Sequence, residues 1–152
     1  MIASLLAIWS NRLLSLLQAF AWLAPLAIRI SVGWVFVESG WGKWHHLDKV
    51  IGFFTDLGLP SPVFQAYLVS TTELAGGLCL LAGLFTRLAS IPLGIIMVVA
   101  IVTTKGGELH GFSDLIGISE YLYLLLLFSL FLQGAGGLSV DAWLKRLLKR
   151  RG

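Results

Sequence analysis

The chain has 152 residues, enough for one domain; 57% of them are hydrophobic and only 12% are charged. Soluble domains carry roughly 25% charged residues, so this composition excludes an ordinary soluble protein and indicates an integral membrane protein. The net charge of +3 does not indicate nucleic-acid binding, because five of the eleven basic residues lie in the last eight positions. The single cysteine, Cys79, excludes an intrachain disulfide and any CxxC redox or zinc motif.

The first 22 residues are apolar but amphipathic. Four polar side chains share one helical face, and the large apolar ones lie elsewhere: Ser4, Asn11, Ser15 and Gln18. This pattern predicts a helix over residues 1–22 that lies in the membrane interface. A cleavable signal peptide is the alternative, since QAFA resembles a cleavage site. However, Asn11 and Arg12 interrupt the apolar stretch, and no basic residue starts it.

Four further apolar blocks are long enough to cross a hydrocarbon core about 30 Å thick, which takes roughly 17–25 helical residues. They cover residues 25–41, 62–85, 88–104 and 117–132. Pro25 and Pro62 suit the first turns of their helices, and the glycines of QGAGG end the fourth block. We therefore expect an all-α membrane protein, with a four-transmembrane-helix bundle over residues 23–135 and a basic tail over residues 136–152.

The distribution of lysine and arginine between the connections sets the expected orientation. An even number of spans places both termini on one side, together with Arg87 and the basic tail, whereas the lysines of the other side are interleaved with acids. Both termini are thus expected in the cytoplasm, in the inner membrane of a bacterium or archaeon. The tail should lie on anionic headgroups with Trp143, Leu144, Leu147 and Leu148 in the apolar layer, or alternatively bind a partner protein.

The two outer connections cover residues 42–62 and 105–116. In the first, apolar residues recur at helical spacing before Gly58 and Pro60: Leu47, Val50, Phe54 and Leu57. This spacing predicts a short interfacial or re-entrant helix.

Four ionisable side chains fall within the spans, where an ionised group costs about 2.5–3.5 kcal/mol on insertion scales: Arg29, Glu38, Glu73 and Glu120. Arg29 and Glu38 are nine residues apart and therefore point to opposite helical faces. Arg29 shares its face with Gly33 and Gly40, small residues that allow another helix to approach closely. The rise per residue then predicts an ion pair between Arg29 and Glu73. The alternative is that Arg29 reaches the inner headgroups and Glu73 stays protonated.

A second group of residues is expected at the outer mouth of the bundle: Trp34, Glu38, Trp41, Lys43, His45, His46, His110, Glu120 and Tyr123. An interfacial aromatic belt explains the rings but not the two acids. His46 and His110 with a carboxylate would suit a metal ion, although HxxxH and HExxH spacings are absent. Histidines hydrogen-bonded to loops are the simpler interpretation. An aromatic wall with a carboxylate and a histidine would equally suit a quinone.

Several short motifs also follow one another in a distinctive order. They are Arg29 with Gly33, Gly40 with Lys43, Gly58-Leu59-Pro60, Glu73 with Gly76 and Gly77, and Gly83-Leu84-Phe85-Thr86-Arg87. This series resembles the DoxX family of four-helix membrane proteins over residues 25–134. Glu38 departs from the family pattern, in which a different polar residue or a histidine often precedes the glycine.

The resemblance implies two competing functions. Relatives include the membrane subunit of a thiosulfate:quinone oxidoreductase, and others occur beside oxidative-stress, detoxification or metal-handling proteins. The first expectation is a non-catalytic component of the bilayer, an anchor or a small-solute or metal-handling partner acting at the outer face. The second is a membrane subunit of a quinone-linked oxidoreductase. Such a subunit would need a redox partner protein or a metal for electron donation, because the sequence lacks a haem histidine pair, an Fe–S cysteine set and a nucleotide fingerprint. The candidate ligands are a quinone or a metal ion, and an oligomer is compatible with either function.

Overall fold

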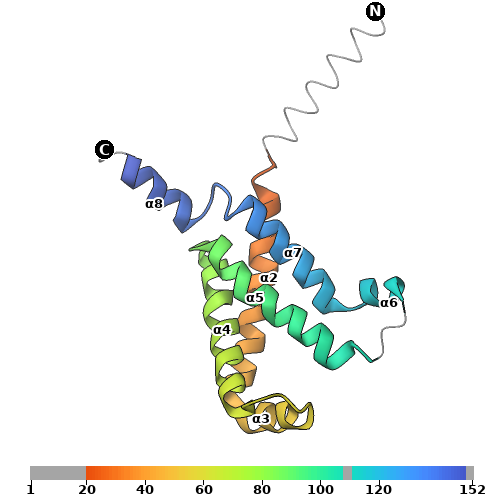
Figure 1. Ribbon diagram of the computed structural model, residues 1–152. Helices are drawn as coiled ribbons and strands as arrows, with labels where there is room; N and C mark the ends of the chain where they lie inside the picture. The colour runs from red at the N-terminus through yellow and green to blue at the C-terminus, as the bar shows by residue number, and fades with distance from the viewer. Residues whose placement is uncertain (1–19, 108–110, 150–152) are drawn as a thin grey trace, which may run out of the picture.

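The computed structural model describes residues 20–107 and 111–149, and within them all regular structure is helical. The helices are α2 (Leu23–His45), α3 (Leu47–Asp56), α4 (Pro62–Ala82), α5 (Thr86–Ala100), α6 (Phe112–Gly117), α7 (Ser119–Gln133) and α8 (Val140–Lys149) (Figure 1). A π-helical turn, η1 (Ile101–Lys105), continues α5. The helix expected over residues 1–22 lies almost wholly outside the described residues, as does His110.

The four long helices occupy the four apolar blocks, and the short helix expected after the first block is α3. α2 packs most extensively against α4, and α5 packs against α7. The two pairs meet near the end that carries α8 and diverge toward α3 and α6 (Figure 1).

Two helical segments in the described part of the chain are long and apolar enough to cross a membrane. They are Leu23–His45 and Thr86–Thr104, while Ser119–Gln133 is apolar but shorter. Large apolar side chains cover the outer surface as well as the core, for example Leu88, Phe128 and Leu122 with 65%, 57% and 53% of their surface exposed. An apolar exterior of this kind fits a helical bundle in a membrane.

The contact between α2 and α4 depends on glycines at two positions. A Cβ atom on Gly40 would lie 2.5 Å from the backbone nitrogen of Leu74, and one on Gly77 would lie 2.7 Å from the backbone nitrogen of Val37. Both separations are shorter than any side chain tolerates, so the two backbones approach closely only because these residues lack a Cβ. The glycine-bearing faces expected from the sequence are therefore the ones that meet.

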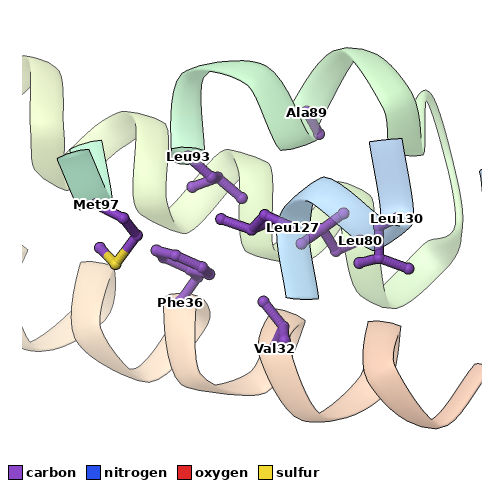
Figure 2. Packing of buried hydrophobic residues seen from close by; sticks show 8 residues of the cluster. All are labelled: Val32, Phe36, Leu80, Ala89, Leu93, Met97, Leu127 and Leu130. Carbon is purple, nitrogen blue, oxygen red and sulfur yellow. The ribbon is translucent and has the colours of Figure 1, made fainter. Parts of the chain in front are cut away.

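A compact apolar cluster joins all four long helices (Figure 2). Its buried members are Val32, Phe36, Leu80, Ala89, Leu93, Met97, Leu127 and Leu130. In Figure 2, Phe36 and Val32 of α2 point toward Leu127 of α7 and Leu93 of α5. The cluster fixes the bundle on the α8 side of the divergence.

The expected ion pair between Arg29 and Glu73 is wrong. The Arg29 guanidinium instead donates to two backbone carbonyls beyond α7, from Nη1 to Ala135 at 2.7 Å and from Nη2 to Leu138 at 2.9 Å. The reason is the register of the two helices: α2 continues to His45, and Gly40 lies against Leu74, so Glu73 is level with the last turns of α2. Arg29 is level with Gly83, which lies ten residues after Glu73, just beyond the end of α4, and therefore too far from the carboxylate for a contact.

A second contact attaches α8 to the same end of the bundle. The Asp141 carboxylate accepts hydrogen bonds from the backbone N–H groups of Phe85 and Thr86, at 2.9 and 3.3 Å, at the start of α5. The Asp141 N–H donates in turn to the Gly83 carbonyl at 3.1 Å. A carboxylate at a helix N-terminus is favoured by the unpaired amides there. Together with Arg29, Asp141 fixes where the basic tail leaves the bundle.

Replacing Arg29 by leucine should loosen this end of the protein. The carbonyls of Ala135 and Leu138 would lose their charged donor, and each buried unsatisfied carbonyl costs about 1–3 kcal/mol. We expect faster amide hydrogen exchange across residues 134–142, with little change in α3. Arg29→Lys keeps the charge but not the two-pronged geometry, and it should show most of the same effect. Wild-type exchange rates in R29K would contradict this role of the guanidinium.

Candidate functional site

A cavity of about 900 Å³ lies between the diverging helix pairs at the α3 end. Its walls come from α2, α3, α4, the end of α5 with η1, and the start of α7. Most of the lining is apolar, including Val35, Phe36, Phe54, Val69 and Met97. Pockets for small organic ligands commonly have roughly 300–1,000 Å³ and this predominantly apolar character.

One wall carries a buried ionic group formed by α2 and α4. Lys43 Nζ lies 2.5 Å from both carboxylate oxygens of Glu73 and donates to Ser39 Oγ at 3.2 Å, while Ser39 Oγ donates to Glu73 Oε2 at 2.9 Å. The Glu73 side chain is 1% exposed, whereas Lys43 is 29% exposed and lines the cavity. Lys43 thus compensates a carboxylate that would otherwise be buried without a counter-charge.

The local sequence explains how this group forms. Ser39 and Lys43 are four residues apart and therefore lie on the same face of α2. The close contact between Gly40 and Leu74 brings the neighbouring Glu73 against that face. Any bulkier residue at Gly40 would separate the carboxylate from both partners.

The other wall is polar as well. Ser119, Glu120 and Tyr123 of α7 line it, and Ser119 Oγ donates to Glu120 Oε2 at 3.1 Å. Thr103 and Thr104 of η1 also line it, each donating its hydroxyl to the carbonyl four residues earlier, at 2.8 and 2.6 Å. Glu120 lies in the first turn of α7, where the helix N-terminus favours a negative charge.

The rim of the cavity is apolar and exposed between α4 and α5. Phe64 and Leu68 of α4 have 66% and 52% of their surface exposed, and Ile95 and Val99 of α5 have 59% and 43%. All four line the cavity. The opening therefore lies on the apolar lateral surface of the bundle, between α4 and α5, which a membrane would cover.

The structure divides the expected outer cluster into two parts. Lys43, Glu120 and Tyr123 line the cavity, and Glu73, expected as a purely structural residue, joins them. Ser39, Thr103 and Thr104 also line it, although the sequence had not singled them out. The four-residue spacing of Ser39 and Lys43 was the signal available for the first of these.

The remaining members of the expected cluster lie on other surfaces. Trp34 and Trp41 are 62% and 59% exposed, and Glu38 between them is exposed too. The His45 ring packs on Trp41 with centroids 4.5 Å apart, and its Nδ1 lies 2.9 Å from the Trp41 carbonyl oxygen. Both residues belong to α2, so His45 hydrogen-bonds to its own helix and not to a loop. His46 is exposed at the junction of α2 and α3.

The described part of the chain contains no cluster of metal-ligating side chains. Within residues 20–107 and 111–149, no three side chains of histidine, cysteine, aspartate or glutamate gather closely enough to hold one. His110, one of the two histidines considered as ligands, lies outside those ranges.

Known proteins similar to the chain point to one family. The DoxX family profile matches residues 24–106. "Uncharacterized membrane protein Rv3486" of Mycobacterium tuberculosis is 38% identical over 136 residues, 82% of each chain. "Putative oxidoreductase CatD" of Bacillus subtilis is 33% identical over 114 residues, 75% of this chain and 80% of the relative. No solved structure matches. The chain therefore belongs to the DoxX family of membrane proteins.

Proposed function

We propose that this protein is a binding component of a bacterial inner membrane that holds a small lipophilic molecule with a polar head in the cavity between its helix pairs. The observation that carries the proposal is the combination of volume and lining. A cavity of about 900 Å³ is mostly apolar, yet polar side chains from opposite walls face into it at one end. A purely polar solute would make poor contacts with the apolar lining. A purely apolar solute would leave the polar groups of the lining without hydrogen-bond partners.

The expected pose follows from where the polar residues lie. Lys43 is close to the end of α2, Thr103 and Thr104 follow α5, and Glu120 is at the start of α7. The polar head would therefore lie toward the α3 end, and the apolar part would lie deeper, near Phe36 and toward the exposed rim. The lining could donate to the head from Lys43 and accept from it at Glu120.

The proposed topology has all four long helices crossing the bilayer. Both termini then lie in the cytoplasm, with the membrane domain over residues 23–135 and the basic tail over residues 136–152. The lengths of α2 and of Thr86–Thr104, and the short helix α3 between α2 and α4, support this arrangement.

A second candidate function is the membrane subunit of a quinone-linked oxidoreductase, such as one of the thiosulfate:quinone type. Two polar walls suit a ligand with oxygens at both ends of a ring, and one relative is named as an oxidoreductase. A partner protein would supply two electrons for the reduction of a quinone to a quinol. Glu120 and Tyr123 are the residues of this chain that could deliver protons to its oxygens.

Narrowing the cavity should weaken binding of the ligand. Val69 lines the cavity on α4, so Val69→Phe is expected to occupy part of its volume and weaken binding at least tenfold. Val63, on the same helix, is 52% exposed and does not line the cavity, so Val63→Phe is the matched control. The measurement is a calorimetric titration of the purified protein in mild detergent with a short-chain benzoquinone.

The outcomes separate the two candidates. Binding that is lost in V69F but kept in V63F supports the cavity as the site. Reduction of the bound quinone by an added partner and electron donor would favour the oxidoreductase subunit. Equal affinity of V69F and V63F would contradict both.

A further inference from the structure

A second cavity, of about 600 Å³, lies at the opposite end of the bundle, where α8 leaves it. We call it the α8 groove. One side is formed by Phe85, Arg87 and Leu88 at the start of α5, and the other by Leu144, Lys145 and Leu148 of α8. The segment from Gln133 to Gly136 also lines it. The groove shares no lining residue with the cavity described above.

Two exposed cations line the α8 groove. Arg87 and Lys145 are both exposed and line it from opposite sides. Arg87 Nη2 donates to the Leu132 carbonyl at 3.0 Å, which holds the guanidinium over the groove. The acid in the lining, Asp141, is directed at the amides of Phe85 and Thr86. Both cations are therefore accessible, while the acid of the lining is hydrogen-bonded to the start of α5.

Exposed apolar side chains continue the groove on both sides. Phe85, Leu88 and Leu148 have 61%, 65% and 73% of their surface exposed, although each lines the groove. A ligand that satisfies this lining must carry an anion and an extended apolar part together. A phospholipid has both.

The amphipathic pattern of α8 places the groove at headgroup level. Trp143, Leu144, Leu147 and Leu148 lie on one face, and the charged residues lie on the other: Asp141, Lys145, Arg146 and Lys149. A basic amphipathic helix of this kind lies in the plane of the interface. Because Asp141 fixes the start of α8 to α5, the helix cannot turn its apolar face elsewhere without breaking those hydrogen bonds.

We propose that the α8 groove is a binding site for one anionic phospholipid. Its phosphate lies between Arg87 and Lys145, and an acyl chain runs along Leu88 and the outer surface of α5. This lipid site is separate from the main cavity, because the two lie at opposite ends of the bundle. Binding of a phospholipid here does not require a ligand in the main cavity.

Native mass spectrometry of the full-length protein in mild detergent tests this site. Purified protein is titrated with phosphatidylglycerol or with phosphatidylcholine, and the lipid-bound fraction is measured. Wild type should bind one phosphatidylglycerol at least tenfold more tightly than phosphatidylcholine. Since a direct, exposed ion pair contributes up to about fivefold in affinity, Lys145→Gln should weaken binding about fivefold and the double variant R87Q/K145Q up to about thirtyfold.

Lys149→Gln is the matched control, because it removes the same charge from α8 outside the groove. It should weaken binding less than twofold. If K145Q and K149Q lose the same amount of lipid affinity, the lipid is attracted diffusely to α8 and the proposal of a defined site is overturned. Unchanged lipid affinity in K145Q would overturn it as well. Inorganic phosphate added at the same concentrations should not compete, and full displacement of the lipid by phosphate would show a free-anion site instead. If R87Q fails to fold, K145Q alone decides the outcome, since Lys145 is exposed on α8.

Discussion

Gly40→Ala should destabilise the bundle by more than about 3 kcal/mol, above the usual 1–3 kcal/mol for an overpacked core. The added methyl group would lie 2.5 Å from the Leu74 nitrogen and 2.9 Å from its Cα. Both of these are backbone atoms, which cannot move aside as the end of a side chain does. α2 and α4 must then separate, and the same shift would pull Ser39 and Lys43 away from Glu73.

Gly42→Ala is the matched control for this prediction. Gly42 lies two residues further along the same helix, and a Cβ there would meet no atom within 4 Å. The alanine should therefore be neutral or stabilise the helix by up to about 1 kcal/mol through its higher helix propensity. Thermal unfolding of both variants in the same detergent makes the comparison. If G40A unfolds at the same temperature as G42A, the close contact of α2 and α4 through Gly40 is wrong.

Lys43→Met should cost about 3 kcal/mol, because it leaves the Glu73 carboxylate buried with only Ser39 as a partner. Removing one member of a buried ion pair typically costs about 3–5 kcal/mol, and the partial exposure of Lys43 favours the lower end. The double variant K43M/E73Q removes both charges and should regain a large part of this loss. Ligand binding should weaken in both variants, since both alter the polar wall of the cavity.

The control for the charge itself is Lys49→Met on α3. Lys49 is exposed and also lines the cavity, so its loss removes a nearby cation without leaving a buried acid unpaired. The free energy of unfolding of K49M should differ from that of wild type by less than about 0.5 kcal/mol, as for most surface substitutions. The prediction for Lys43 fails if K43M and K49M are equally stable, or if K43M/E73Q is less stable than K43M.

Most of the helical architecture could be predicted from the sequence, because helix periodicity and the 30 Å thickness of a bilayer core both leave local signals. Pro25 and Pro62 marked helix starts, and the helical spacing of Leu47, Val50 and Phe54 marked α3. Gly33 and Gly40, on the same face as Arg29, also identified the face of α2 that packs closely against another helix. These features depend on residues near one another in the sequence.

The polar contacts could not be predicted in the same way, because they depend on register between distant segments. The partners of Arg29 are carbonyls more than 100 residues away, in a loop whose path no local pattern encodes. Because α2 is offset against α4, the partner of Glu73 is Lys43 and not Arg29. Glu38 was expected in the cluster at the outer mouth of the bundle, yet it lies on the exposed face of α2 with Trp34 and Trp41 and does not line the cavity.

The central claim, that the cavity at the α3 end holds a lipophilic molecule with a polar head, is tested most directly by what the protein carries out of the membrane. Wild type, V63F and V69F would be purified identically in mild detergent, and their organic extracts compared by mass spectrometry. We predict a lipophilic compound with carbonyl or hydroxyl groups, near one per protein in wild type and V63F and depleted in V69F. An extract of V69F that matches wild type in every such compound would contradict the claim.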